Sequence, residues 1–384
     1  MKRRKATLLA ALAAGTTAVL ALGAATAGAS AGTGHDPGSR PLPYQVFAPY
    51  YEMYDTSTGL ASLSRQSGAR YLSLAFLQTA APGSCTAYWD GDTSQPIAPS
   101  SYGSDIADIQ ARGGNVIPSF GGYTADTTST DIADSCTSVP AIAQVYESLI
   151  TTYNVPRIDL DVEADSLANT AGIDRRNQAI AMTEAWAAAH HRRIEFSYTL
   201  PTFPTGLTSA GYAVLQDAVA DGARIAAVNL LTFDYYLGTP QDMVADTESA
   251  ADGLFTQLRS LYPAATARQL WHTIGITEMP GIDDFGPDET FSTADAVTIA
   301  HWAQRQGIGL ISFWALQRDN GGCPGTKGAG TCSGVSQPDW YFSHVFEHFT
   351  HSPGRSTGRF AASLPCSRPV DWPTSMRYPS GSRM

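Results

Sequence analysis

Residues 158–163 read Ile-Asp-Leu-Asp-Val-Glu, and this repeat places three carboxylates, Asp159, Asp161 and Glu163, at every second position. Side chains alternate across a β-strand, so the three acids share one face and the three aliphatic residues share the other. Crowding and burial both disfavour ionised carboxyls, so we expect raised pKa values, which are typical of active sites. A solvent-facing strand is the alternative, but the repeat contains no Lys or Arg and its other members are aliphatic.

This acidic row predicts glycoside hydrolysis. The reaction needs an acid that protonates the leaving oxygen and a group that stabilises an oxocarbenium-like centre. Glu163 is the expected proton donor, because the negative charge of Asp161 raises its pKa. Asp161 is expected within reach of Glu163 or of a substrate amide, and Asp159 is expected to share a proton with Asp161. A second carboxylate at the roughly 5 Å separation of ordinary retaining enzymes is not evident. This favours attack by the 2-acetamido oxygen of the sugar itself.

Short apolar runs alternate with longer amphipathic stretches along the chain. The runs predict eight strands, at residues 45–50, 71–76, 115–119, 157–162, 193–199, 227–233, 271–277 and 309–314. Helical periodicity covers residues 140–153, 173–191, 210–221, 243–262 and 293–306. This alternation predicts an α/β fold with a parallel sheet, and eight repeats predict a (β/α)8 TIM barrel that forms a single catalytic domain. An open doubly wound sheet is the alternative, although its Gly-x-Gly-x-x-Gly fingerprint is absent after the first strand.

The active sites of such barrels lie at the carboxyl ends of the strands. Polar and aromatic residues gather at those ends in this sequence. They include Tyr50, Tyr51, Gln78, Ser119, Gly121, Gly122, Tyr123, Glu163, Tyr198, Asp234, Tyr235, Glu278 and Trp314. An even scatter along the strands would not give this bias, so we expect a site at that end of the barrel.

The motifs resemble those of glycoside hydrolase family 18, the chitinases and their endo-N-acetylglucosaminidase relatives. The family's Asp-x-Asp-x-Glu signature corresponds to residues 159–163, and its Ser-x-Gly-Gly signature corresponds to residues 119–122. The resemblance runs from the first strand to the last and includes Phe76, Asp234 and Trp314. More closely, residues 173–180 and 197–201 look like secreted actinobacterial and bacillar chitinases.

The resemblance implies a chitinase that acts on chitin or chito-oligosaccharides with net retention, and that needs no cofactor and no metal. Glu163 would be the general acid, Asp161 would orient the acetamido group, and Asp159 would support them. The implied substrate-binding residues are Ser119, Gly121, Gly122, Tyr198, Asp234, Tyr235, Glu278, Trp314, Phe76 and Tyr50. Among these, Trp314 would form the floor of the central sugar subsite, where an aromatic face packs on the sugar C–H groups.

The sequence departs from the family pattern at two places. Pro156 and Arg157 stand where the fuller signature has Asp-Gly, at the far end of the acidic strand. Phe233 stands where the family has a tyrosine whose hydroxyl holds the acetamido oxygen. Tyr235 and Tyr198 are the two candidates to supply the missing hydroxyl.

Residues 1–31 begin with a basic run, continue with Ala and Leu and end in small residues, which is typical of a cleaved secretory signal. We therefore expect a secreted, extracellular protein without a membrane anchor. Residues 32–42 are expected to form a short linker, 43–351 the catalytic domain, and 352–384 a disordered tail. The net charge of −11 argues against nucleic acid as a partner, and we expect a monomer.

Five cysteines in an exported chain suggest disulfide bonds. Cys323 and Cys332 bracket a Gly-rich loop that can close a small ring. Cys85 and Cys136 follow the second and third predicted strands and are placed to pin neighbouring loops. Cys366 is left over in the tail and is expected to be a free thiol.

Other functions have to be weighed against a chitinase. A barrel of this family that has lost its acid would be a sugar-binding lectin, but the three carboxylates are present. Those carboxylates could instead hold Ca²⁺ or Mg²⁺, although ligands on one strand surround an ion poorly. Residues 344–348 read His-Val-Phe-Glu-His, a zinc-protease pattern with a high false-positive risk. The structural alternative for that pattern is the last barrel helix, with Val345, Phe346 and Phe349 packed inward.

The substrate itself also has alternatives. Peptidoglycan strands and N-glycan cores carry the same 2-acetamido group, so the same chemistry would serve an endo-β-N-acetylglucosaminidase. The sequence shows no separate carbohydrate-binding module, and we therefore expect soluble oligomers to be better substrates than crystalline chitin.

Overall fold

The computed structural model describes residues 39–55 and 57–351. The expected signal segment, residues 1–31, and the expected tail, residues 352–384 with Cys366, lie outside these ranges. Most of the expected linker does too, although Leu42 at its end packs against a buried cluster at the amino ends of the strands. No helix within the described ranges is both long and apolar enough to span a bilayer.

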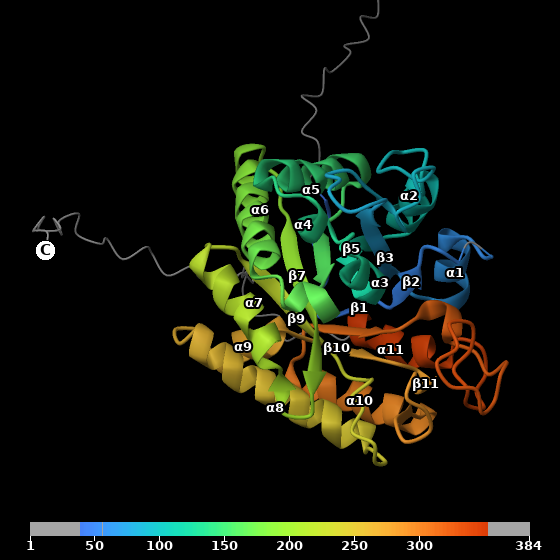
Figure 1. The fold of residues 1–384 in the computed structure, drawn as a ribbon. Coiled ribbons are helices and arrows are strands. Elements are labelled where there is room, and N and C mark those ends of the chain that lie inside the picture. Colours follow the sequence, from blue (N-terminus) through green and yellow to red (C-terminus); the bar gives the residue numbers. More distant parts are fainter. Residues whose placement is uncertain (1–38, 56, 352–384) are drawn as a thin grey trace, which may run out of the picture. The chain divides into compact units, whose positions relative to one another are not determined.

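Eight parallel strands of the described residues form the sheet at the centre of the fold (Figure 1). β1 (Val46–Phe47) and β2 (Tyr50–Glu52) are two halves of the first strand, separated by Ala48 and Pro49. Because β1 pairs with β13 and β2 pairs with β3, the sheet closes on itself as the expected barrel. The other seven strands are β3 (Tyr71–Thr79), β5 (Asn115–Gly121), β6 (Arg157–Asp161), β7 (Glu195–Phe203), β9 (Ile225–Leu231), β10 (Ile274–Glu278) and β13 (Leu310–Phe313).

All eight strands differ from their predicted bounds at one end or both, β10 and β9 among them. β10 begins at Ile274, because the three residues from Trp271 onward end a helix, α9 (Ala267–Thr273), which starts at a capping box of Thr266 and Gln269. β9 ends at Leu231, so Phe233 lies in the loop that follows. Short antiparallel strands decorate the barrel, namely β4 (Ala87–Trp89), β8 (Gly206–Leu207), β11 (Gly281–Ile282) and β12 (Thr290–Phe291).

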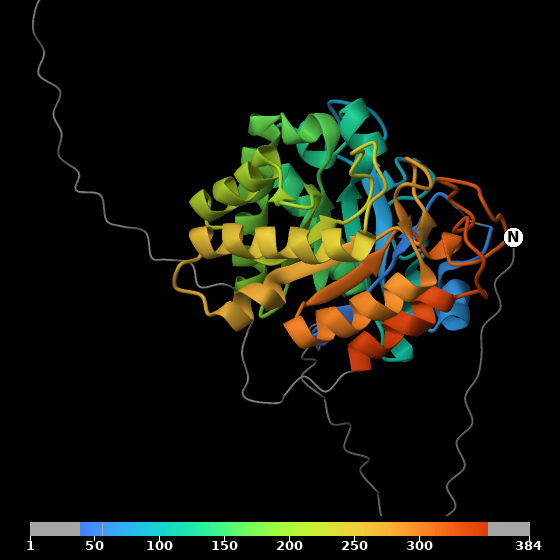
Figure 2. The ribbon, with the colours of Figure 1, turned by 90° about the horizontal axis from the view of Figure 1, so that it is seen from below.

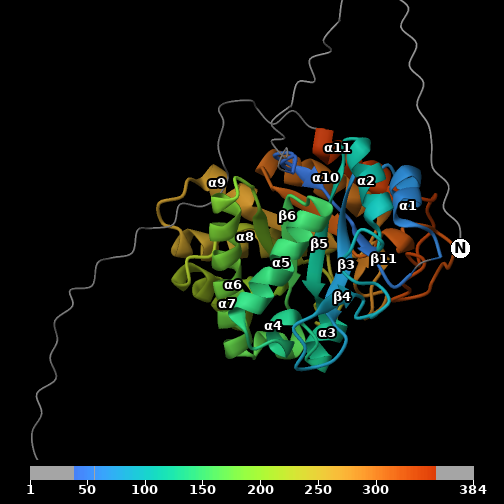
Figure 3. The same ribbon diagram turned by 90° about the horizontal axis from the view of Figure 1, so that it is seen from above.

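Helices cover the outside of the sheet (Figures 1 and 3). The five predicted amphipathic segments are α5 (Val139–Tyr153), α6 (Thr170–Ala189), α7 (Ser209–Ala220), α8 (Met243–Leu261) and α10 (Thr293–Gln306). Each helix is preceded by a capping residue whose side chain accepts a hydrogen bond from a backbone N–H of the first turn. These capping residues are, in order, Ser138, Asn169, Thr208, Asp242 and Ser292. Figure 2 shows α8, α10 and α11 (Tyr341–His351) side by side on the outer face.

Shorter helices lie in the loops between these elements. They are α1 (Leu60–Ser67), α2 (Gly103–Ala111), α3 (Gly122–Thr128), α4 (Ile132–Ser135) and the 3₁₀ turns η1 (Ala164–Leu167) and η2 (Leu316–Arg318). Of these, α3 and η1 directly follow β5 and β6 at the carboxyl end of the barrel.

The barrel interior is built in layers. The amino ends of the strands enclose an apolar plug of Val46, Ala48, Tyr71, Ile117 and Leu310. Above it lies a buried polar layer made of Ser119, Asp159, Ser197, Thr199, Asn229 and Thr277. The top layer is aromatic and contains Tyr50, Phe76 and Trp314. Such layering fills the barrel below the site, so chemistry is confined to its carboxyl end.

Two disulfide bonds join described residues, and the predicted pairing of Cys323 with Cys332 is confirmed. Cys85, in the loop after β3, pairs with Cys136, which ends α4. Cys323 is bonded to Cys332, nine residues further along the chain, within the loop after η2.

Candidate active site

A pocket of about 460 Å³ opens at the carboxyl ends of the strands. Acidic side chains in its wall are Asp90, Asp161, Glu163, Asp234 and Asp284, and aromatic side chains are Tyr50, Tyr54, Phe76, Tyr123, Phe233, Phe285 and Trp314. Carboxyls among aromatic faces suit a neutral sugar, because the faces pack on C–H groups and the carboxyls accept hydroxyl hydrogens.

Asp159 lies beneath the pocket and is saturated with hydrogen bonds. Its Oδ1 accepts from Ser197 at 2.6 Å, its Oδ2 accepts from Ser119 at 2.7 Å and from Tyr50 at 3.0 Å, and Thr199 approaches both oxygens at 3.1 Å. Burial raises the pKa of Asp159, and these hydrogen bonds oppose the rise. Asp159 therefore joins β6 to three neighbouring strand segments and leaves no free lone pair for a substrate.

Asp161, one layer higher, has the opposite environment. Its Oδ1 is buried and has no hydrogen-bond partner among the described residues. Burial and the nearby carboxyls of Glu163, Asp159 and Asp126 raise the pKa of Asp161 well above its usual value. A carboxyl that is raised in pKa and lacks a partner is ready to bind a donor such as an amide N–H.

Glu163 follows β6 and is only partly exposed, at the pocket wall. Burial raises its pKa to about 7, and a hydrogen bond from the backbone N–H of Tyr123 opposes the rise. The carboxyl can thus hold a proton near neutral pH and release it within the same range, which general acid–base catalysis requires.

The Ser-Phe-Gly-Gly segment brings β5 close to the acidic strand. Ser119 is buried and donates to Asp159, so it supports the site from below rather than lining it. Gly121 and Gly122 have φ of +94° and +79°. A Cβ at Gly121 would collide with the carbonyl oxygen of Asp161, and one at Gly122 would collide with the ring of Phe76. Glycine is therefore needed at both positions.

Three aromatic rings form the floor of the pocket. Phe76 and Trp314 are stacked, with ring centroids 5.5 Å apart, and Tyr50 lies 5.7 Å from Trp314. The register between β3 and β5 shifts between Ala75 and Leu77, which turns Phe76 toward the pocket.

Asp234 lines the opposite wall, in the loop after β9. Its backbone adopts φ of +53°, and its N–H donates to Asp283 Oδ2 at 3.1 Å. Glu289 accepts the next two backbone N–H groups, those of Tyr235 and Tyr236, at 2.7 Å each. Burial and the neighbouring charge of Asp283 raise the pKa of Asp234 to about 8. The loop is therefore fixed by carboxylates from the segment after β10.

Five residues predicted to bind substrate do not line the pocket. Ser119 and Gly122 adjoin it, through Asp159 and the ring of Phe76 respectively, and the other three lie away from it. The prediction for Tyr198 is wrong, because its side chain points outward from β7 and its hydroxyl donates to Asn177 of α6 at 2.6 Å. Glu278 is fully buried and accepts from Thr247 of α8 at 2.9 Å. Tyr235 is buried in the same outer layer, close to Glu278. Neither Tyr198 nor Tyr235 can supply the hydroxyl that Phe233 lacks.

Several pocket residues were missed by sequence reasoning. Tyr123 was expected at the end of the third strand, directly after the Ser-Phe-Gly-Gly segment, but was not named as a substrate-binding residue. Tyr54, Asp90, Asp284 and Phe285 come from loops, whose course the periodicity of the chain does not predict.

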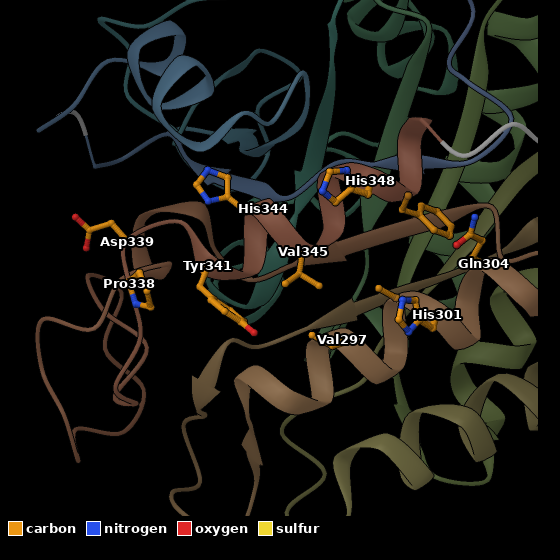
Figure 4. A pocket seen from close by; sticks show the side chains of 11 residues that line it. Val297, His301, Gln304, Pro338, Asp339, Tyr341, His344, Val345 and His348 are labelled. Carbon is orange, nitrogen blue, oxygen red and sulfur yellow. The ribbon is translucent and has the colours of Figure 1, made fainter.

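A second hollow of about 470 Å³ lies outside the barrel between α10 and α11. Figure 4 shows His301 on α10 and His344 and His348 on α11. The carboxylate of Glu347 lies against Gly68 at the end of α1, so close that a Cβ there would collide with it. Phe346 and Phe349 are buried and Val345 is packed against the core, as expected for the last barrel helix. The zinc-protease pattern is therefore not assembled as a ligand set.

Within the described ranges, one group of three acidic side chains brings its oxygens within 4.8 Å of one another. It consists of Asp174, Asp217 and Asp221, on α6 and at the end of α7, outside the barrel. The three carboxylates of the acidic strand are not such a group, and the oxygens of Asp159 accept hydrogen bonds from hydroxyl groups.

Comparison with known proteins gives relatives of one kind, although no protein-family model matches. The probable bifunctional chitinase/lysozyme of Escherichia coli strain K12 is 31% identical over 322 residues, which cover 80% of this chain and 35% of that protein. Endochitinase 11 of Metarhizium anisopliae is 32% identical over 290 residues, which cover 72% of this chain and 53% of that protein. The chain thus spans about a third and about half of these relatives.

Solved structures agree with the fold. Active domain 2 of the chitinase from Pyrococcus furiosus matches with a TM-score of 0.72 and 29% identity, over 84% of this chain and all of that one. The same domain complexed with chito-oligosaccharides matches with a TM-score of 0.73 and 28% identity. YKL-39, solved in the presence of chitooligosaccharides, matches with a TM-score of 0.53 and 10% identity, a likeness of fold alone.

Proposed function

We propose, from the premise that this chain belongs to the chitinase-like proteins of glycoside hydrolase family 18, that it hydrolyses β-1,4 bonds between N-acetylglucosamine units. Its substrates are chitin or chito-oligosaccharides, the ligand class that the complex of the Pyrococcus domain names. The reaction proceeds with net retention and is assisted by the substrate.

In the first step, Glu163 gives its proton to the glycosidic oxygen while the bond from that oxygen to the anomeric carbon breaks. The 2-acetamido oxygen of the same sugar forms a new bond to the anomeric carbon from the opposite face. Asp161 accepts the acetamido N–H, which aligns the oxygen and balances the positive charge that develops on the ring. The leaving chain departs with the proton from Glu163.

In the second step, Glu163 acts as the base. It removes a proton from a water molecule, whose oxygen bonds to the anomeric carbon as the acetamido oxygen leaves. Two inversions at the same carbon give overall retention, and Glu163 regains its proton. Trp314 and Phe76 hold the sugar through both steps by packing on its C–H groups.

One observation carries the proposal. Glu163, with a pKa of about 7, shares a pocket with Asp161, whose buried Oδ1 has no partner among the described residues. A neutral donor beside an unpaired acceptor is the arrangement that leaving-group protonation and acetamide alignment require.

The test measures reducing ends released from a soluble chito-oligosaccharide by the wild-type protein and by Glu163→Gln. The amide cannot donate a titratable proton, so we expect kcat to fall about 10²-fold or more. Glu147→Gln, on the outer helix α5, is the matched control and should keep wild-type activity. Oligosaccharide binding without release of reducing ends by the wild type would favour the lectin alternative.

The substrate range follows from the acetamido group rather than from chitin as such. Peptidoglycan strands and N-glycan cores are therefore second candidates, and the chitinase/lysozyme name of the Escherichia coli relative supports testing them. Soluble oligomers are expected to react faster than crystalline chitin, and equal rates on both would contradict this order.

Export and assembly belong to the same proposal. We infer a secreted enzyme of the actinobacterial type that acts as a monomer. Support comes from the basic and apolar residues of 1–31 and from the two disulfide bonds, which are typical of oxidising compartments. Protein that stays inside the producing cell would contradict export, and a dimer by light scattering would contradict the monomer.

A further inference from the structure

The backbone and the carboxyl of Glu163 are both held by one short helix. The N–H of Glu163 donates to Oδ2 of Asp126 in α3, and the N–H of Tyr123, also in α3, donates to the Glu163 carboxylate. α3 packs on η1, which begins directly after Glu163. These reciprocal bonds fix the residue at the point where the strand ends.

The position of α3 follows from the glycine pair before it. With φ of +94° and +79°, Gly121 and Gly122 turn the chain sharply out of β5, and the absence of side chains lets that turn contact Asp161 and Phe76. The helix therefore begins beside the acidic strand, and its second turn places Asp126 behind Glu163.

Asp126 is buried, with 1% of its surface exposed, and its Oδ1 has no hydrogen-bond partner among the described residues. The charged groups near it are Asp131, which caps the start of α4, Arg176 of α6, and Asp161 of β6, and the hydroxyl of Ser166 in η1 lowers its pKa. Arg176 pairs with Asp131 at 2.6 Å, and its positive charge lowers the pKa of Asp126. Burial and the charge of Asp131 raise the pKa of Asp126 to about 9.

A protonated Asp126 keeps an oxygen that accepts the Glu163 N–H while it carries no negative charge. An ionised Asp126 would add a further charge beside Asp161 and Glu163, which already repel each other. The buried position thus provides an acceptor without adding to this repulsion.

We propose that Asp126 is a positioning residue for Glu163: by accepting its backbone N–H, it fixes the end of β6 so that the carboxyl faces the pocket beside Asp161. This inference rests on the proposed function, because Glu163 is the acid of that reaction. Asp126, the residue that positions Glu163, lies four positions beyond the Ser-Phe-Gly-Gly segment.

The test compares Asp126→Asn with Asp126→Ala. The amide oxygen of Asn can accept the same N–H, so we expect kcat within about threefold of wild type. Ala removes the acceptor and lets the carboxyl move, so we expect kcat to fall about 30-fold or more, with KM within about threefold of wild type. Glu147→Gln, which changes a carboxyl on the outer helix α5, is the control and should keep kcat within about threefold of wild type.

A second readout does not depend on activity. The titration of the Glu163 carboxyl is followed by ¹³C NMR, with the signal assigned by its absence in Glu163→Gln. In wild type and Asp126→Asn the pKa should stay near 7, and in Asp126→Ala it should fall toward the ordinary value of a glutamate in water. This readout holds even if the wild type proves inactive, so failure of the proposed function and failure of this inference are distinguishable.

The inference is overturned if Asp126→Ala keeps both the kcat and the Glu163 titration of wild type. It is equally overturned if Asp126→Asn loses as much kcat as Asp126→Ala, because the acceptor would then not be the relevant property. Thermal unfolding checks that each variant is folded, and Asp126→Leu, which fills the same volume, replaces Asp126→Ala if the latter does not fold.

Discussion

Glu163 owes its chemistry to burial at the end of a strand rather than to a special partner. Because burial raises its pKa to about 7, the carboxyl of Glu163 carries the proton below that pH and loses it above that pH. We expect kcat/KM on a soluble chito-oligosaccharide to fall about tenfold per pH unit above the pKa. A pH profile from acid to mildly alkaline conditions measures this, with unfolding monitored in parallel. A flat profile through two units above neutrality would contradict the assignment.

The acidic residues were the part of the site that sequence alone predicted best. Alternation in a single strand fixed the shared face of Asp159, Asp161 and Glu163. Alternation also explains why Tyr198 is wrong for the site. In the parallel register Asp159 pairs with Ser197, which points inward with it, so Tyr198 must point outward. That argument needs the register between two strands, which the sequence of one strand does not contain.

Phe233 stands where glycoside hydrolase family 18 has a tyrosine, and neither Tyr198 nor Tyr235 supplies a hydroxyl to the pocket in its place. Tyr198 bonds to Asn177 outside the barrel, and Tyr235 is buried against α8. In the proposed mechanism, Asp161 alone therefore aligns the acetamido group, and its Oδ1, which has no partner among the described residues, can accept the acetamido N–H. Sequence could show that a hydroxyl was missing, but only packing shows that Tyr198 donates to Asn177 and that Tyr235 is buried away from the pocket.

At the scale of elements, long periodic helices were predictable and short ones were not. α10 has the predicted bounds, and it starts at a capping box formed by Ser292 and Asp295. α3 escaped prediction because its seven residues, Gly122–Thr128, contain too few apolar positions to show a period. Yet α3 holds Glu163, so the element that positions the acid was the one that periodicity could not reveal.

The two disulfides differ in the length of chain that they constrain. Cys85–Cys136 spans 51 residues and Cys323–Cys332 spans 9. In the chain-entropy account, the longer loop is worth about 4 kcal/mol of unfolding free energy and the shorter about 2.5 kcal/mol. We therefore expect Cys85→Ser with Cys136→Ser to destabilise the protein more than Cys323→Ser with Cys332→Ser. Urea unfolding of both double variants measures this, and the reverse order would contradict it.

At the scale of the whole molecule, the number of repeats led to the correct fold. Eight strands in the order of the chain predicted a closed barrel, and the pairing of β1 with β13 and of β2 with β3 closes it. What the sequence could not predict is the vertical layering, because the height of each inward residue depends on the stagger between strands. That layering places Asp159 in the buried polar layer and Asp161 and Glu163 in the pocket above it.

Buried carboxyls make stability depend on pH. The pKa values of Asp126, Glu278 and Asp234 are raised to about 9, 8 and 8, so between pH 4.5 and 8 the folded state binds more protons than the unfolded state. Their stabilising contribution is present at low pH and is lost as pH rises through these values, at up to about 1.4 kcal/mol per pH unit for each group.

Glu278 offers the clearest test of this dependence, because it is fully buried on the outer face of β10 and bonded to Thr247. We expect Glu278→Gln to reduce the loss of unfolding free energy between pH 5 and 8, since glutamine keeps the acceptor and does not titrate. Urea unfolding at the two pH values measures this for the variant and for wild type. An unchanged pH dependence in Glu278→Gln would contradict the protonation assigned to Glu278.

In the mechanism that we propose, the sugar's own acetamido oxygen attacks the anomeric carbon while Glu163 supplies the proton. The most direct test follows hydrolysis of a chito-oligosaccharide by ¹H NMR and reads the anomer of the new reducing end before mutarotation. The proposed mechanism predicts the β-anomer as the first product. The α-anomer as the first product would contradict it.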